Sequence, residues 1–147
     1  MKVLLYMLLL LAPMANGGSD LVVEDAWIRA MPPGSPNSAA YMSLRNTSER
    51  AVRVISVTGA VADQVEVHRS VNEQGVWKMQ RLEALPVAAG ATVELSPGGA
   101  HLMLFGLSRT LREGETVPLE LLLEDGASVS FEATVQRQAA AASGHHH

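Results

Sequence analysis

Short runs in which apolar and polar residues alternate are the feature of this chain that most restricts its fold. Between residues 21 and 136 these runs are rich in valine and are separated by Gly, Pro, Asn and Ser. Alternation with a period of two sends successive side chains to opposite faces of a strand, so each run predicts a β-strand with one buried face. The predicted strands cover residues 21–30, 39–46, 51–58, 63–70, 75–82, 91–96, 100–106, 116–124 and 128–136.

The spacing of these runs indicates the fold class. Strands that recur every roughly 8 to 15 residues, with turns such as SPGG and EDGA between them, are typical of an all-β, immunoglobulin-like antiparallel β-sandwich or a barrel. The 147 residues provide one domain with a core of its own. The segment LSRTLREG, residues 107–114, has room for one short helical turn.

Both ends of the chain lack this alternation. MKVLLYMLLLLAPMANG places a lysine before an apolar stretch that is too short to span a bilayer, and small residues follow, which is the order of a secretory signal. We therefore expect a signal peptide at residues 1–17, one β-sandwich domain at 18–137 and an Ala/His tail at 138–147. Such a signal predicts a bacterial protein exported to the periplasm or cell envelope, with no membrane span after cleavage.

The composition excludes several kinds of partner and site. No residue is a cysteine, which excludes thiol chemistry, zinc-thiolate sites and blue-copper sites of the usual kind. The formal net charge of −4 argues against a nucleic-acid partner. No nucleophile triad or pair of carboxylates is recognisable, so the sequence does not predict an enzyme.

Two histidines and a methionine in predicted strands are the first candidate ligands for a metal. In AHLMLFG the period of two places His101 and Met103 on one face, while the leucines take the other. In DQVEVHRS the valines take one face, and His68 shares the opposite face with Glu66. Met79 lies on a nearby predicted strand and completes a set of two imidazoles and two thioethers. Thioether sulfur is a soft donor that favours Cu(I) over zinc, calcium or magnesium.

Each of these residues also has an ordinary structural explanation. A methionine in a strand commonly fills the core, and an isolated histidine is commonly solvated or hydrogen-bonded. Met79 is the least defined, because the pattern of GVWKMQRL does not show which face is buried. Asp63 and Glu66 either orient the His68 ring or form a polar strand face, and we favour the polar face. Trp77 either covers a metal or belongs to the core, and we favour the core.

The spacing H-x10-M-x21-H-x-M resembles the signature of the PCuAC-type periplasmic copper chaperones. AWIRAMPPGSPNSAAYMSLRN, SPGGAHLML and LREGETVPLELLLEDG are similar to the family as well, so the resemblance extends over residues 22–136. Many members have a methionine where this chain has Arg69. The resemblance implies a cupredoxin-like β-sandwich with four Cu(I) ligands: His68, Met79, His101 and Met103. It also implies delivery of copper to the dinuclear copper centre in the copper-binding subunit of cytochrome c oxidase, alone or beside a Sco-type thiol protein.

Other interpretations remain open. The tail residues His145, His146 and His147 are either the start of an expression tag or a native segment that binds Cu(II). A metal-free β-sandwich that acts as a binding or structural module of the cell envelope predicts no stoichiometric Cu(I) uptake. A copper redox protein is disfavoured by the missing cysteine and by the thioethers. We expect a monomeric carrier.

Overall fold

The computed structural model describes residues 20–137, which form ten β-strands and contain no helix. The strands are β1 (Leu21–Arg29), β2 (Asn37–Asn46), β3 (Val52–Thr58), β4 (Ala62–Glu73), β5 (Val76–Leu82), β6 (Leu85–Val87), β7 (Thr92–Leu95), β8 (His101–Leu107), β9 (Thr116–Leu123) and β10 (Ser128–Gln136). The all-β fold class is confirmed, and each predicted run coincides with a strand. The short strand β6 was not predicted. The proposed signal peptide and the tail lie outside the described residues.

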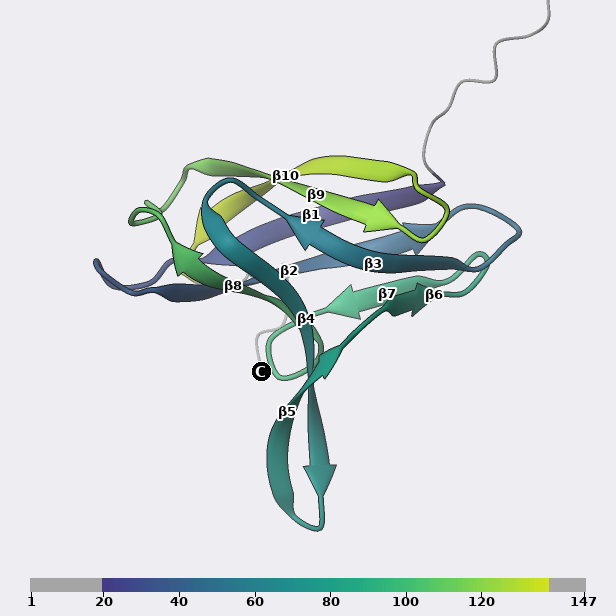
Figure 1. Ribbon diagram of the computed structural model, residues 1–147, viewed down its shortest axis with the longest axis horizontal. Coiled ribbons are helices and arrows are strands. Elements are labelled where there is room, and N and C mark those ends of the chain that lie inside the picture. The colour runs from purple at the N-terminus through teal and green to yellow at the C-terminus, as the bar shows by residue number, and fades with distance from the viewer. Residues whose placement is uncertain (1–19, 138–147) are drawn as a thin grey trace, which may run out of the picture.

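The strands form one sheet that closes on itself into a β-sandwich. Their order is β4-β8-β2-β1-β10-β9-β3, and β3 returns to β4 through a further antiparallel pair. β1 and β10 pair in parallel, whereas the other neighbours in this order are antiparallel. β5 extends the sheet from β4, β6 pairs with β3, and β7 pairs with β2. Figure 1 shows β1, β9 and β10 on one side of the sandwich.

Alternation within the strands determines which side chains form the core. In β9, Val117, Leu119, Leu121 and Leu123 are buried, whereas the residues between them are exposed. In β8, Leu102 and Leu104 likewise lie in the core and are almost completely buried, whereas Leu107 at its end is partly buried. The face of β8 that carries His101 is therefore the outer face of the sheet.

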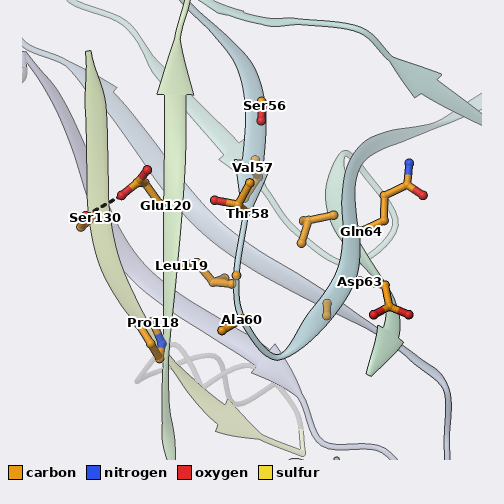
Figure 2. Close-up of a pocket in the computed structure, with 13 residues that line it drawn as sticks. Ser56, Val57, Thr58, Ala60, Asp63, Gln64, Pro118, Leu119, Glu120 and Ser130 are labelled. Atoms are coloured by element: carbon orange, nitrogen blue, oxygen red, sulfur yellow. Dashed lines mark hydrogen bonds between the residues drawn. The ribbon is translucent and has the colours of Figure 1, made fainter. Parts of the chain in front are cut away.

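The junction of β3 and β4 is the least continuous part of the closed sheet. The two strands meet in the pair Val57–Val65. A cleft of about 730 Å³ opens beside this pair, between β3, β4 and β9 (Figure 2). On its β9 side the Ser130 hydroxyl donates to the Glu120 carboxylate at 3.3 Å. Asp63, one of the two carboxylates considered for orienting His68, lines this cleft.

The longest strand, β4, continues past the end of β8. Its pairing with β8 ends at His68, and residues beyond it pair with β5. The hairpin turns at Gln74 and Gly75, whose φ angles of 54° and 84° match the two positive values that a type I′ turn requires. Figure 1 shows this two-stranded segment projecting from the sandwich. Residues 69–80 are called the arm below.

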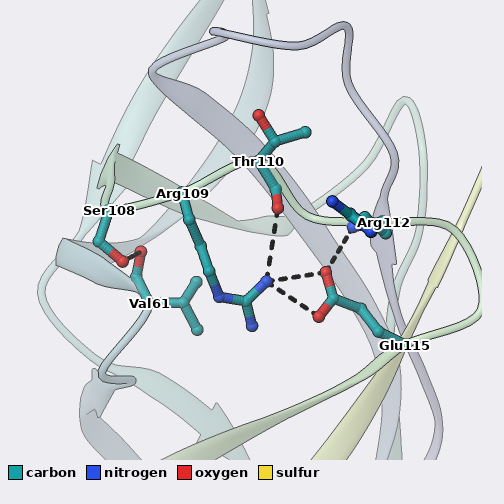
Figure 3. A network of polar contacts seen from close by, with 6 residues as sticks. All are labelled: Val61, Ser108, Arg109, Thr110, Arg112 and Glu115. Carbon is teal, nitrogen blue, oxygen red and sulfur yellow. Dashed lines mark hydrogen bonds and ion pairs between the residues drawn. The ribbon is translucent and has the colours of Figure 1, made fainter.

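The loop between β8 and β9 is held by Glu115. One guanidinium nitrogen of Arg109 donates to both carboxylate oxygens at 2.9 Å, and the backbone N–H of Arg112 donates to one of them (Figure 3). The Ser108 hydroxyl donates to the Val61 carbonyl at 3.3 Å and so connects this loop to the start of β4. The hydrogen bond from Arg109, followed by the one from Arg112, holds the pKa of Glu115 below its usual value.

A lowered pKa in the folded state makes the contribution of Glu115 dependent on pH. Its stabilisation is complete above the usual glutamate pKa of about 4.3 and is lost as the pH falls through the lower folded-state pKa. We expect Glu115→Gln to reduce the free energy of unfolding by less than about 1 kcal/mol at neutral pH, and by less in acid. Urea unfolding of the wild type and the variant, at neutral pH and in acid, measures the loss of unfolding free energy under each condition. Glu132→Gln, at an exposed position of β10, is the control; equal losses for the two variants would contradict the prediction.

Candidate metal centre

His68 and His101 face each other across the ladder between β4 and β8. They are direct partners in the antiparallel register, and their ring centroids lie 6.1 Å apart. His101 is only 6% exposed, and the His68 side chain is 16% exposed. The alternation of both strands places them on the outer face of the sheet, opposite the core valines and leucines. The two predicted imidazole ligands therefore lie together.

Met103 lies two residues beyond His101 on the same face of β8. This methionine packs against a small buried cluster of Ala39 and an aromatic pair on β1 and β2. Trp27 and Tyr41 form that pair, with ring centroids 4.6 Å apart, and the Tyr41 ring lies 6.3 Å from the His101 ring. Met103 and His101 are thus supported by rigid side chains, which fixes a thioether beside an imidazole.

Met79 is farther from this group. Its register partner is Ser70, two residues beyond His68, so that Met79 lies on the arm and diagonal to His68. Strand β4 separates Met79 from the strand that carries His101. The residue is 56% exposed, and its sulfur accepts a hydrogen bond from the Ser70 hydroxyl at 3.3 Å. Long side chains can meet across such a diagonal, so the Met79 thioether can approach His68 without a change of register.

The hydrogen bonds of the two histidines leave different ring nitrogens available. Nε2 of His68 lies 2.7 Å from Oε2 of Glu66, and a carboxylate can only accept, so Nε2 donates and Nδ1 keeps its lone pair. Nδ1 of His101 lies 3.2 Å from the Gly99 carbonyl oxygen, so there Nδ1 donates and Nε2 keeps its lone pair. Metal-binding histidines are commonly oriented by such bonds from the second nitrogen.

Two expectations about neighbouring residues were wrong. Glu66 is more than part of a polar strand face, because its carboxylate contacts the His68 ring directly. Its other oxygen accepts from Gln64 at 2.8 Å and lies 3.6 Å from the Arg81 guanidinium. Trp77 was expected in the core but is 70% exposed on the arm. The spacing of two residues between Glu66 and His68 was the signal that could have revealed their contact.

Tyr41 is an aromatic neighbour of His101, with ring centroids 6.3 Å apart. Burial raises the pKa of Tyr41, against the opposing effect of the Arg29 charge, and the phenol therefore stays neutral. The Arg29 guanidinium lies 5.4 Å from the centroid of the Tyr41 ring. Within residues 20–137, no group of three or more His, Asp or Glu side chains could hold a metal ion. The further candidate donors near His68 and His101 are the thioethers of Met103 and Met79, and none of the four candidate ligands lines the cleft beside β3.

A family described as "Putative lipoprotein LpqE-like" matches residues 21–135 of the chain. The "Putative lipoprotein Lxx21020" of Leifsonia xyli subsp. xyli is 33% identical over 107 residues, which are 72% of this chain and 63% of that protein. An uncharacterized protein of Rickettsia prowazekii, RP573, is 24% identical over 122 residues, which are 76% of this chain and 67% of that protein. The chain thus spans less than two thirds of the Leifsonia relative.

Solved structures with a similar fold include PCuAC domains and DR1885 from Deinococcus radiodurans. The copper-bound PCuAC domain from PmoF2 has a TM-score of 0.69 and 25% identity, over 80% of this chain and 93% of that domain. The CuI form of DR1885 from Deinococcus radiodurans has a TM-score of 0.65 and 30% identity, over 85% of this chain and 82% of that protein. These likenesses confirm the cupredoxin-like β-sandwich that the sequence resemblance implied.

The hydrogen bonds of His68 and His101 predict opposite imidazole tautomers. At about pH 8, where an ordinary imidazole is neutral, long-range ¹H–¹⁵N correlation spectra should show a protonated Nε2 in His68 and a protonated Nδ1 in His101. Single His→Gln variants assign the signals. Glu66→Ala should weaken the preference of His68 for the tautomer protonated at Nε2 and leave the tautomer of His101 unchanged. Glu66→Gln keeps a hydrogen-bond acceptor beside Nε2 and should preserve the preference of His68. Finding the same tautomer in both rings would contradict this prediction.

Proposed function

Because the chain belongs to the LpqE-like family and its fold is that of the PCuAC domains, we propose that it is a metallochaperone that carries Cu(I). The observation that carries this proposal is the direct pairing of His68 with His101, with Met103 next to them on the same face. A copper-bound form of one similar domain and a CuI form of another similar protein support copper as the cargo.

The donor chemistry supports the reduced ion. His68 and His101 offer one lone pair each, Met103 offers a preorganised thioether, and Met79 offers a second thioether from the arm. Such a neutral, soft set suits Cu(I), whereas harder divalent ions prefer oxygen donors. Thioethers also remain available in an oxidising compartment, since they form no disulfides and need no deprotonation.

The position of the site supports carriage rather than catalysis. The four candidate ligands lie on the outer face of the sheet and on the arm beside it, and Met79 on the arm is exposed, so we propose that a recipient reaches the ion from the arm. Copper would leave by stepwise ligand exchange, with each Cu–ligand bond replaced by one to the recipient. From the family resemblance we propose the copper-binding subunit of cytochrome c oxidase as the recipient, reached directly or with a Sco-type thiol protein. We propose that the carrier is a monomer.

We propose the periplasm or the cell envelope as the location. The signal-like segment at residues 1–17 and the lipoprotein descriptions of the family and of the Leifsonia protein support export. Residues 20–137 contain no helix long and apolar enough to cross a bilayer.

Copper uptake tests the proposal directly. The chain without residues 1–17, with the three tail histidines replaced by alanine, is titrated anaerobically with Cu(I) against a chromophoric chelator. We expect one tight equivalent. The His101→Ala/Met103→Leu double variant should lose affinity by at least about 100-fold, since even outer-shell changes at metal sites cost about 10- to 100-fold.

Met42→Leu is the matched control for this experiment, because Met42 is a core methionine that is only 2% exposed. Its conservative change should leave copper affinity unchanged. Circular dichroism checks that each variant is folded. A folded wild type that takes up no Cu(I) would favour the metal-free binding module.

The histidine tail is a separate proposal, a second site for Cu(II) at His145, His146 and His147, which lie outside the described residues. Deleting residues 139–147 should then abolish Cu(II) uptake in excess of the first equivalent while leaving Cu(I) affinity unchanged. Isothermal titration calorimetry with Cu(II) measures the uptake by the full chain and by the chain without residues 139–147. Equal Cu(II) uptake by the two would remove the tail site.

A further inference from the structure

The two candidate thioether ligands have different structural support. Met103 lies on β8, which is paired on both sides, and its register partners are Glu66 on β4 and Ala39 on β2. Met103 also packs against the cluster of Trp27, Ala39 and Tyr41. Moving Met103 would therefore disturb two ladders and the aromatic pair. This thioether is a fixed part of the sheet.

Met79 lies in a much less constrained place. It belongs to β5, the terminal strand in the sheet order, and to the part of the hairpin that projects beyond β8 (Figure 1). The large apolar side chains of β5 beside it, Val76 and Trp77, are exposed. Segments with few buried apolar contacts are the ones that move at low free-energy cost. The arm can therefore carry the Met79 sulfur toward the histidines or away from them while the sandwich stays intact.

From this difference we infer that Met79 is the exchange ligand of the copper site. His68, His101 and Met103 hold Cu(I) on the sheet, and the Met79 thioether is the donor that the recipient replaces first. This inference rests on the proposed function. In the step, a bond forms between Cu(I) and a soft sulfur donor of the recipient, and the bond between Cu(I) and the Met79 sulfur breaks. Copper remains Cu(I), so no electron and no oxidant are needed.

The arrangement of the site supports this order of events. The Ser70 hydroxyl donates a hydrogen bond to the Met79 sulfur at 3.3 Å, so the thioether has a partner when it is away from the metal. The arm also brings the exposed face of Trp77 next to Met79, because the two residues are separated by one position on the strand. A recipient that approaches from the arm meets Met79 before it meets His101 or Met103.

Two matched substitutions test the inference. Met79→Leu and Met103→Leu each remove one sulfur and keep the side chain apolar and of similar volume. In the Cu(I)-loaded mature chain, Met79→Leu should lower the equilibrium affinity by about 10-fold, the lower end of the loss that changes around a metal site produce, whereas Met103→Leu should lower it by more than about 100-fold. Stopped-flow transfer of Cu(I) to bathocuproine disulfonate should be faster from Met79→Leu than from wild type, since one position on copper is already open.

X-ray absorption of the loaded proteins gives a second readout that does not depend on the stability of Met103→Leu. Wild type should show two sulfur and two nitrogen neighbours, and Met79→Leu should show one sulfur and two nitrogens with copper still bound stoichiometrically. Equal losses of affinity for the two variants, or loss of copper from Met79→Leu, would overturn the inference and leave the copper carrier intact. A wild type that binds no Cu(I) would instead overturn the proposed function.

Discussion

The register of β4 against β8 is the constraint on which both the core and the candidate copper site depend. With His68 opposite His101, both imidazoles lie on the outer face while Leu102 stays in the core. A slip of one residue would exchange the two faces of a strand and bury an imidazole among aliphatic side chains. The far end of β8 is restrained as well, because Gly106 has a φ of 66° and a Cβ there would lie 2.3 Å from the Asp63 carboxylate.

Burial explains which parts of this arrangement were predictable from sequence. In β9 every second residue is buried, and in β8 Leu102 and Leu104 face the core, so the alternation of these strands predicted that His101 and Met103 share the other face of β8. Strand β5 is exposed along most of its length, so its sequence carries no alternation and could not show where Met79 points. Trp77 was misplaced for the same reason, because an aromatic residue on a projecting hairpin has no core to enter. The three residues of β6 are too few to show a period.

Strand order lies beyond what alternation can predict. Nothing in the period of two pairs β4 with β8, which are separated along the chain by three other strands. The spacing of the four candidate ligands implied, through resemblance to a family, that these two strands lie close together. The register of β4 against β8 explains this proximity for the two histidines. The contact between Glu66 and His68, by contrast, is local and follows from two positions on one strand face.

The parallel pairing of β1 with β10 affects how this chain reaches its fold. Trp27 pairs with Thr134, so the first strand of the domain acquires this neighbour only after nearly the whole chain has been synthesised. Until then β1 lacks one partner, and so does β9, whose other partner in the final sheet is β3. Such long-range pairing slows folding and leaves unpaired edges exposed. Sheet closure is therefore a late step that needs the intact polypeptide, and fragments that lack β10 should aggregate instead of folding.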